Sequence, residues 1–365
     1  MLTPCRRLSI NAVVRAYTAP RWLPGGNLQT IWAALYARRG LAGPPRYRRE
    51  RWATPDGDFI DVDFADRPLL SSAASEAAGK SAQGPLVLRA SAVPVAQPLL
   101  VLFHGLEGSS RSHYAETFAE FAAARGWAYA VPHFRGCSGE PNLAPRAYHS
   151  GDYEEIDWIL KRMRRQQRAA GGGPVMAVGV SLGGNALMRW AAEAGTEAAQ
   201  VVDAVASVSA PLDLVAGGTA IGRGFNKLAY TRMFLSTLKP KALAKLAQHP
   251  GLFDGNALRQ VTDLHSFDNL FTGPLHGFRD ANDYWTRGSA KPHLHRIRVP
   301  ALALNALNDP FVPAASLPQA QQVGACVTLW QPAHGGHVGF PAGVLPGHVR
   351  RMPDAVVDWL AQHSI

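Results

Sequence analysis

Residues 174–185 read PVMAVGVSLGGN, and this stretch decides the fold that we expect for the chain. Its first half is an apolar run typical of a buried strand, and residues 185–192 fit a helix. Between them, residues 179–183 form a G-x-S-x-G pattern that places Ser181 at a sharp turn from strand to helix. Small glycines relieve crowding at such a turn and leave the hydroxyl exposed. We therefore predict that Ser181 is a nucleophile.

Short apolar runs alternate with helical segments along the chain. Residues 50–64 predict a β-hairpin that turns at Asp56-Gly57, and residues 66–98 predict a surface loop rich in Ala, Ser, Gly and Pro. Strands are expected at 99–103, 127–134, 175–180, 204–208, 301–305 and 326–330, and helices at 112–125, 151–169 and 353–362. This order predicts a mostly parallel central sheet with helices on both faces, in a single α/β domain spanning residues 1–365.

Two segments fall outside this alternation. Residues 1–49 are expected to form an N-terminal arm, and their start lacks the apolar stretch and cleavage site of a signal peptide, so we expect a cytoplasmic protein. Residues 214–295 contain no clear strand, and their helical periodicity predicts a helical cap inserted before the late strands. Such a cap would lie over the C-terminal edge of the sheet, where α/β proteins bind their ligands.

A serine hydroxyl is a weak nucleophile at neutral pH, so it needs a base and an acid that orients the base. Both residue types follow Ser181 in the chain. Asp309 comes shortly after the apolar run at 301–304, and His337 comes after the last expected strand. Because the C-terminal ends of parallel strands share one edge of the sheet, we predict that Ser181, Asp309 and His337 meet there as a catalytic triad.

Three other residues compete for the roles of base and acid. His334 is an alternative base, but two flexible glycines precede His337 and favour it. Asp213 follows the strand before the expected cap and Asp283 lies inside that cap, so both are alternative acids. Asp309 is favoured because it lies in the loop after a late strand, at the same sheet edge as the serine.

The tetrahedral intermediate of acyl transfer needs N–H donors for its negatively charged oxygen. We expect one donor to be the backbone N–H of Leu182 and the other to be that of Leu106, in the loop after the first parallel strand. The side chain of His104 is expected to be structural. This mechanism requires no cofactor and no metal, and neither a Walker A motif nor a G-x-G-x-x-G pattern after the first strand is present.

The composition limits the other classes of function. Hydrophobic residues make up 47% of the 365 residues, and no stretch approaches 18 consecutive apolar residues, so a globular protein without a spanning helix is expected. The net charge of +10 is spread without a dense Lys/Arg run or a nucleic-acid motif, so we expect a solvated basic surface and no nucleic-acid partner. Three widely spaced cysteines predict incidental thiols rather than a disulfide framework.

Residues 215–253 contain no Asp or Glu, and basic and apolar residues are interleaved there. Two interpretations stay open: a cap with a solvated basic face, or a cationic surface that contacts an anionic membrane peripherally. In both, the apolar side is expected to line an acyl pocket. The basic residues are Arg223, Lys227, Arg232, Lys239, Lys241 and Lys245, and the apolar ones are Phe225, Leu228, Met233, Phe234, Leu235, Leu238, Leu243 and Leu246.

Eight longer motifs are spread over the chain from about residue 20 onward. They are GNLQT (26–30), HGLEG (104–108), FRGCSGEPN (134–142), YHSG (148–151), GVSLGGN (179–185), PLHGF (274–278), NDPF (308–311) and GGHVGF (335–340). Together they resemble the YheT-like esterase family, a branch of the α/β-hydrolase superfamily. The resemblance implies the α/β-hydrolase fold, a triad on Ser181, Asp309 and His337, and activity on short- to medium-chain acyl esters. The motifs at 26–30 and 148–151 have no obvious chemistry of their own.

The residues and the resemblance together predict a serine carboxylic ester hydrolase that cleaves a small-molecule acyl ester through an acyl-enzyme intermediate. An acyltransferase would use the same triad, with an alcohol in place of water in the second step, and a lipase or thioesterase is a narrower variant. A non-catalytic binding protein with the hydrolase fold would usually lack one member of the triad, whereas all three residues are present.

Overall fold

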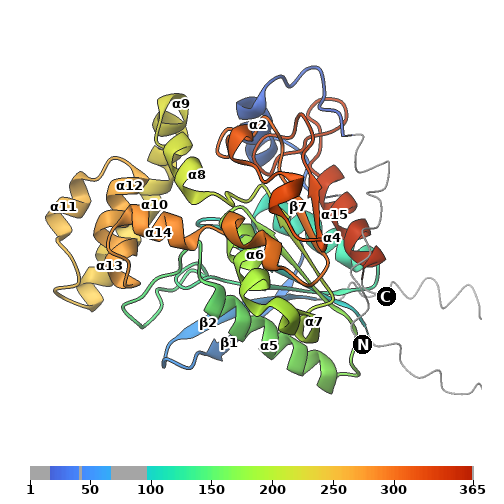
Figure 1. Cartoon of the computed structure of the whole chain (residues 1–365), viewed down its shortest axis with the longest axis horizontal. Coiled ribbons are helices and arrows are strands. Elements are labelled where there is room, and N and C mark those ends of the chain that lie inside the picture. The colour runs from blue at the N-terminus through green and yellow to red at the C-terminus, as the bar shows by residue number, and fades with distance from the viewer. Residues whose placement is uncertain (1–16, 41–42, 67–96, 364–365) are drawn as a thin grey trace, which may run out of the picture.

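The computed structural model describes residues 17–40, 43–66 and 97–363. In this part of the chain, eight strands form one sheet in the order β1-β2-β4-β3-β5-β6-β7-β8 (Figure 1). They are β1 (Tyr47–Ala53), β2 (Phe59–Ala65), β3 (Leu99–Phe103), β4 (Ala128–Pro132), β5 (Val175–Val180), β6 (Ala204–Val208), β7 (Ala301–Leu304) and β8 (Val327–Trp330). β2 pairs antiparallel with β1 and β4, and the pairs from β4 to β8 are parallel, so the predicted mostly parallel sheet is confirmed.

The central strands are continuous apolar runs because both of their faces are covered. In β3, Leu99, Val101 and Phe103 pack into the hydrophobic cluster on one face of the sheet. Leu100 and Leu102 pack into the cluster on the other face. All five side chains are buried, so β3 carries the loop that follows it on a rigid base.

Helices cover both faces of the sheet, as predicted (Figure 1). α5 (Tyr153–Ala169) and α6 (Leu182–Ala194) pack on one face, with η1 (Gly195–Glu197) and α7 (Ala198–Val201) after them. α4 (His113–Ala124) and α15 (Arg351–Gln362) pack on the other face. The short 3₁₀ turns η5 (Ala314–Ser316) and η6 (Ala320–Gln322) lie between β7 and β8.

The segment between β6 and β7 is helical, as its periodicity indicates. Its elements are α8 (Leu214–Ile221), α9 (Gly224–Asn226), η2 (Lys227–Thr231), α10 (Arg232–Gln248), α11 (Gly255–Gln260), α12 (Leu264–Phe267), η3 (Asp268–Thr272), α13 (Gly273–Leu275), α14 (Ala281–Gly288) and η4 (Lys291–Arg296). Leu235, Leu258, Phe267 and Phe271 belong to a separate hydrophobic cluster within this segment. The segment therefore packs around its own small core beside the sheet (Figure 1).

The N-terminal third contains the predicted hairpin and one unpredicted helix. β1 and β2 turn through Gly57, which has a φ of 78°, as expected for an Asp-Gly turn. The helix α2 (Gly26–Leu35) and the first residues of β1 lie inside the segment expected to be an arm. The loop predicted at 66–98 lies almost entirely outside the described residues.

The structure also bears on the expected absence of a membrane-spanning helix and on the state of the cysteines. Within the described residues, no helix combines the length and the hydropathy needed to cross a bilayer. Cys137 is a free thiol, but Cys326 is disulfide-bonded, so the prediction of incidental thiols is wrong for Cys326. Widely spaced cysteines still pair when the fold brings distant segments together, and their spacing in the sequence does not show this.

Candidate active site

Ser181 lies at the sharp turn between β5 and α6. Its backbone has a φ of 52° and a ψ of −118°, a strained conformation for a residue other than glycine. The N–H of Ser181 donates to the carbonyl of Val208 at 2.8 Å and holds the turn in place. A side chain at Gly183 would collide with the carbonyls of Phe103 and His104, so only glycine fits there. The G-x-S-x-G pattern thus reflects close packing of backbone around the serine.

The three predicted triad residues meet in the structure. The Ser181 Oγ lies 2.9 Å from His337 Nε2, and His337 Nδ1 lies 2.9 Å from Asp309 Oδ2. A carboxylate only accepts hydrogen bonds, so Nδ1 carries the imidazole proton and Nε2 is left to accept from the serine. This is the arrangement in which a histidine removes a hydroxyl proton as a general base.

The acid and the base are held by backbone and by burial. Asp309 Oδ1 accepts the N–H groups of Phe311 at 2.8 Å and Val312 at 3.2 Å, which orients the carboxylate toward the imidazole. The Phe311 ring lies 4.2 Å from the His337 ring, measured between centroids. Asp309 and His337 are both buried, so their hydrogen bond is shielded from water.

The competing residues lie elsewhere. His334 is exposed, and its Nδ1 lies 3.4 Å from Asn308 Nδ2 rather than near Ser181. Asp213 caps the N-terminus of α8, and Asp283 pairs with two arginines on or next to α14. Each of the three alternative residues therefore has contacts away from Ser181, and the geometry around Ser181 favours the predicted triad.

The two predicted oxyanion donors, the N–H groups of Leu106 and Leu182, lie at the same cavity as Ser181. The loop after β3 closes with a hydrogen bond of 2.9 Å from the N–H of Gly108 to the carbonyl of Gly105. Inside that turn, the N–H of Glu107 donates to a tyrosine hydroxyl. Among the described residues, the N–H groups of Leu106 and Leu182 find no acceptor, and both residues line the same cavity as Ser181. Free N–H groups at such a cavity are the kind of donor that a negatively charged oxygen needs.

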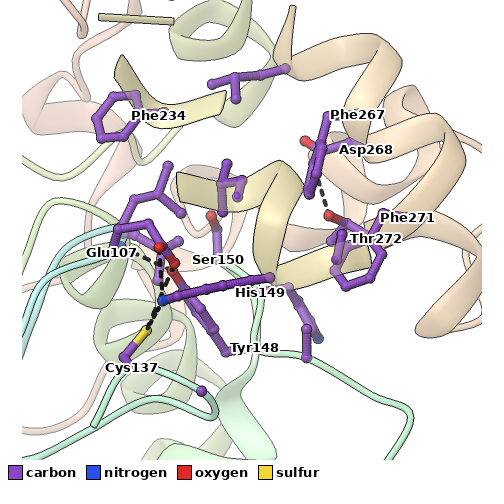
Figure 2. A pocket seen from close by; sticks show the side chains of 18 of the residues that line it. Glu107, Cys137, Tyr148, His149, Ser150, Phe234, Phe267, Asp268, Phe271 and Thr272 are labelled. Atoms are coloured by element: carbon purple, nitrogen blue, oxygen red, sulfur yellow. Dashed lines mark hydrogen bonds and ion pairs between the residues drawn. The ribbon is translucent and has the colours of Figure 1, made fainter. Parts of the chain in front are cut away.

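A cavity of about 540 Å³ opens from Ser181 and His337 toward the helical segment 214–295. Figure 2 shows Phe234 at one side of it, across from Phe267 and Phe271. The other apolar side chains on its wall include Leu106, Leu214, Ile221, Leu238, Leu264, Trp285 and Phe311. A pocket with so many apolar side chains suits an acyl chain or another apolar group.

The half-buried carboxyl group of Asp268 lies in the wall of this cavity. Asp268 accepts hydrogen bonds from Thr272 Oγ1 at 2.6 Å and from Trp285 Nε1 at 2.8 Å. Burial raises the pKa of Asp268 to about 6, because the interior disfavours the charged form more than these two donors stabilise it. Asp268 ties η3 to α14 beneath the apolar lining.

The expectation of a solvated basic face is wrong for Lys245 of α10, whereas Lys241 is exposed but ion-paired. Lys245 is buried, and its ammonium group donates to Gln248 Oε1 at 3.0 Å and to the carbonyl of Asn142. Lys241 lines the cavity, and its ammonium group forms an ion pair with Glu107 at 2.7 Å. Helical periodicity alone does not reveal this, because both lysines reach carbonyl or carboxylate oxygens on distant loops.

The apolar residues of the same segment also divide. Phe234 and Leu238 line the cavity, as predicted. Phe225, Leu228 and Met233 do not, since they are 54%, 76% and 54% exposed to solvent. The expectation that the apolar residues form one pocket-lining face is therefore wrong for these three, which are exposed, and also for Leu235, Leu243 and Leu246, which are not on the cavity wall.

The motif at 26–30, which carried no assignable chemistry in the sequence, supports the triad from α2. The Thr30 hydroxyl accepts the backbone N–H of His337 at 2.8 Å. Gln29 Oε1 accepts the Nδ2 of Asn308 at 3.0 Å and the N–H of Gly335 at 2.9 Å. One turn of helix therefore fixes the loops of both the acid and the base. The only signal in the sequence was the motif itself.

The motif at 148–151 supports the other side of the site. The Tyr148 hydroxyl lies 2.9 Å from both the N–H and the Oε1 of Glu107, next to Leu106. The Nδ2 of Asn185, on α6, donates to the carbonyl of Ser150 at 2.7 Å. The motif thus connects the loop after β3 to the helix that follows the serine.

No metal site accompanies these residues. In the described part of the chain, no three His, Cys, Asp or Glu side chains are grouped so that they could hold a metal ion. The buried His104 accepts the N–H of Phe134 at 3.1 Å, and burial lowers its pKa to about 3. His104 is therefore a neutral structural residue, as expected from the sequence.

Comparison with known proteins identifies the family of the chain. The family model described as alpha/beta hydrolase fold matches residues 98–343, so the chain belongs to the α/β-hydrolase family. Within that family it is similar to YheT of Escherichia coli (strain K12), an esterase by provisional assignment, with 38% identity over 92% of this chain and 90% of YheT. The resemblance to the YheT-like branch is thereby confirmed.

More distant proteins share the fold. The human protein named phospholipase ABHD3 is 25% identical over 92% of this chain and 76% of its own length. Esterase Pf2001 of Pyrococcus furiosus superposes with a TM-score of 0.52 at 14% identity, over 90% of this chain and 97% of that one. The chain is thus an α/β hydrolase of the esterase and lipase type.

Proposed function

We propose that this protein is a serine carboxylic ester hydrolase that cleaves short- to medium-chain acyl esters through an acyl-enzyme intermediate. The observation that carries the proposal is the hydrogen-bonded series Ser181–His337–Asp309, with contacts of 2.9 Å at both steps. The series ends at the wall of an apolar cavity of about 540 Å³. A nucleophile, its base and an acyl pocket therefore meet at one point.

The first half of the reaction forms the acyl-enzyme. His337 Nε2 takes the proton of the Ser181 hydroxyl as Oγ attacks the ester carbonyl carbon. The N–H groups of Leu106 and Leu182 donate to the oxygen that becomes negatively charged, and Asp309 stabilises the imidazolium. The intermediate collapses when His337 returns its proton to the departing alcohol. The acyl group is then bonded to Ser181 Oγ.

The second half releases the acid. His337 removes a proton from water, and the water oxygen attacks the carbonyl carbon of the acyl group bonded to Ser181. The intermediate breaks its bond to Ser181 Oγ, which takes the proton back from His337. If an alcohol entered in place of water, the same steps would transfer the acyl group to the alcohol oxygen and release a new ester.

The helical segment 214–295 serves in this proposal as a cap over the acyl pocket of the single hydrolase domain. Phe234 and Leu238 of α10 and Leu264 of α12 lie on the wall of the cavity, as does Ser181. Since the surroundings of the acyl chain are largely apolar, the enzyme prefers apolar acyl chains to polar ones.

The outer surface of the cap is proposed to contact anionic membrane lipid peripherally. Phe225, Leu228 and Met233 are exposed apolar side chains, and the basic residues Arg223 and Arg232 are exposed among them. A cationic surface with exposed apolar side chains favours adsorption to an anionic bilayer. A lipid ester could then reach the acyl pocket from the membrane surface.

A chain-length series tests the proposed activity. The purified protein would be assayed on p-nitrophenyl esters from acetate to laurate, with and without an added short alcohol. The proposal expects turnover of uncharged acyl chains and release of free acid as the main product. Release of a new ester as the main product in the presence of alcohol would make the protein an acyltransferase. No turnover of any ester would refute the proposal.

A further inference from the structure

Glu107 has an unusual conformation next to the proposed oxyanion donor. It occupies the third position of the turn from Gly105 to Gly108, and its φ of 57° lies in the left-handed region. That position of such a turn usually holds glycine or asparagine, because other side chains are crowded there. A glutamate in this position needs compensating contacts.

The contacts of Glu107 come from two different elements. The Tyr148 hydroxyl lies 2.9 Å from the Glu107 N–H and 2.9 Å from its carboxylate oxygen Oε1. The Lys241 ammonium group lies 2.7 Å from Oε2. The Glu107 side chain is only 10% exposed, so its charge depends on these partners rather than on water. Figure 2 shows Glu107 beside Tyr148 and Cys137 on one side of the cavity.

The two partners of Glu107 differ: Tyr148 is anchored by ring stacking, and Lys241 comes from the cap. The Tyr148 ring stacks on Phe134 at 5.2 Å and 8° between planes, so its hydroxyl has a fixed position. Lys241 belongs to α10 of the cap and follows Pro240, which cannot donate a backbone hydrogen bond inside the helix. Lys241 thereby links the cap to the turn that contains Leu106.

We infer that Glu107 is a positioning residue, which keeps the Leu106 N–H aimed at the oxyanion only while Tyr148 and the cap residue Lys241 both hold its carboxylate. This inference rests on the proposed function and deepens it. Glu107 donates nothing to the substrate in this role, since its own N–H is taken by Tyr148. The position of α10 therefore controls whether the Leu106 N–H points toward the oxyanion.

The test compares Glu107→Gln and Lys241→Met with wild type on a p-nitrophenyl ester. Because an oxyanion donor acts in the transition state, kcat is expected to fall by about 10- to 100-fold for Glu107→Gln, with KM changed by less than about 2-fold. Lys241→Met is expected to lower kcat by about 5-fold or more, and Lys241→Arg is expected to recover most of it.

The matched control is Arg259→Met, which removes the same charge from an exposed position of the cap, on α11. Its kcat is expected to stay near wild type. Thermal unfolding of each variant shows whether the fold is intact. If Glu107→Gln unfolds, the kcat of Lys241→Met still tests the inference. Wild-type kcat in both Glu107→Gln and Lys241→Met, or a rise in KM alone, would overturn the inference. An inactive wild type would instead refute the proposed function.

Discussion

The backbone of His337, the proposed base, is held by one side-chain contact, the hydroxyl group of Thr30. It accepts the N–H of His337 at 2.8 Å, and Thr30 is buried within α2. No other described side chain is hydrogen-bonded to that N–H. The position of the imidazole relative to Ser181 therefore depends on a residue far away in the chain.

Thr30→Val is expected to lower kcat by about 10-fold, because a buried N–H without an acceptor costs about 1–3 kcal/mol and the loop shifts to relieve it. KM should change little, since Thr30 does not line the cavity. Steady-state kinetics on a p-nitrophenyl ester measures both. Thr262→Val, at an exposed threonine of the cap, is the control. Equal kcat values for the two variants would show that Thr30 does not position the base.

At this scale, the sequence predicts residues that carry local signals. Ser181 lies in a recognisable turn, and Asp309 and His337 follow late strands, so the sheet edge brings them together. Thr30 and Glu107 could not be predicted in the same way. Their roles depend on hydrogen bonds to residues that are far away in the chain, and no local pattern encodes such contacts.

Among the elements, the strands were the most predictable. Each central strand is buried on both faces, so it leaves a short apolar run in the sequence. Helix α2 was missed because it was assigned to an arm, and α10 was predicted with a basic face that is partly buried. Tertiary contacts decide which side of an isolated helix faces solvent.

Asp268, in η3, is expected to make the free energy of unfolding depend on pH. Burial raises the pKa of Asp268 to about 6 from an ordinary value of 3.8. A carboxyl group whose pKa is raised by folding contributes its full stability below about pH 3.8 and loses it as the pH rises through 6. Asp268→Asn stays neutral, so it lacks this loss.

The free energy of unfolding of wild type, relative to Asp268→Asn, is therefore expected to fall by about 2 kcal/mol between pH 4 and pH 8, since each pKa unit corresponds to about 1.4 kcal/mol and part of the loss has occurred by pH 4. Urea unfolding of both proteins at the two pH values measures the difference. A difference that is the same at both pH values would mean that the carboxyl group of Asp268 is not desolvated.

The basic surface of the molecule is expected to bind anionic membranes. The net charge is +10, and the cap contributes exposed basic and apolar side chains together. Binding to anionic vesicles is expected at 0.1 M salt and should weaken steeply at 1 M, because the Debye length shrinks from about 10 Å to about 3 Å. Vesicle co-sedimentation with anionic and neutral lipids measures this.

The triple variant Arg223→Gln, Lys227→Gln, Arg232→Gln is expected to bind anionic vesicles on the order of 100-fold more weakly, at about 1 kcal/mol for each basic residue. Its control changes Lys161, Arg165 and Arg168 of α5 to Gln, which removes the same charge from a different helix (Figure 1). Equal binding to both vesicle types, or equal loss in both variants, would leave only a solvated cap surface.

The central claim is that the acyl group is carried by Ser181. The most direct measurement is covalent labelling with a fluorophosphonate, followed by identification of the modified residue by mass spectrometry. A single labelled serine, at position 181, is expected in wild type. In Ser181→Ala, no label and a loss of ester turnover by several orders of magnitude are expected, with an unchanged fold. A label on another serine, or ester turnover that survives in Ser181→Ala, would contradict the role of Ser181.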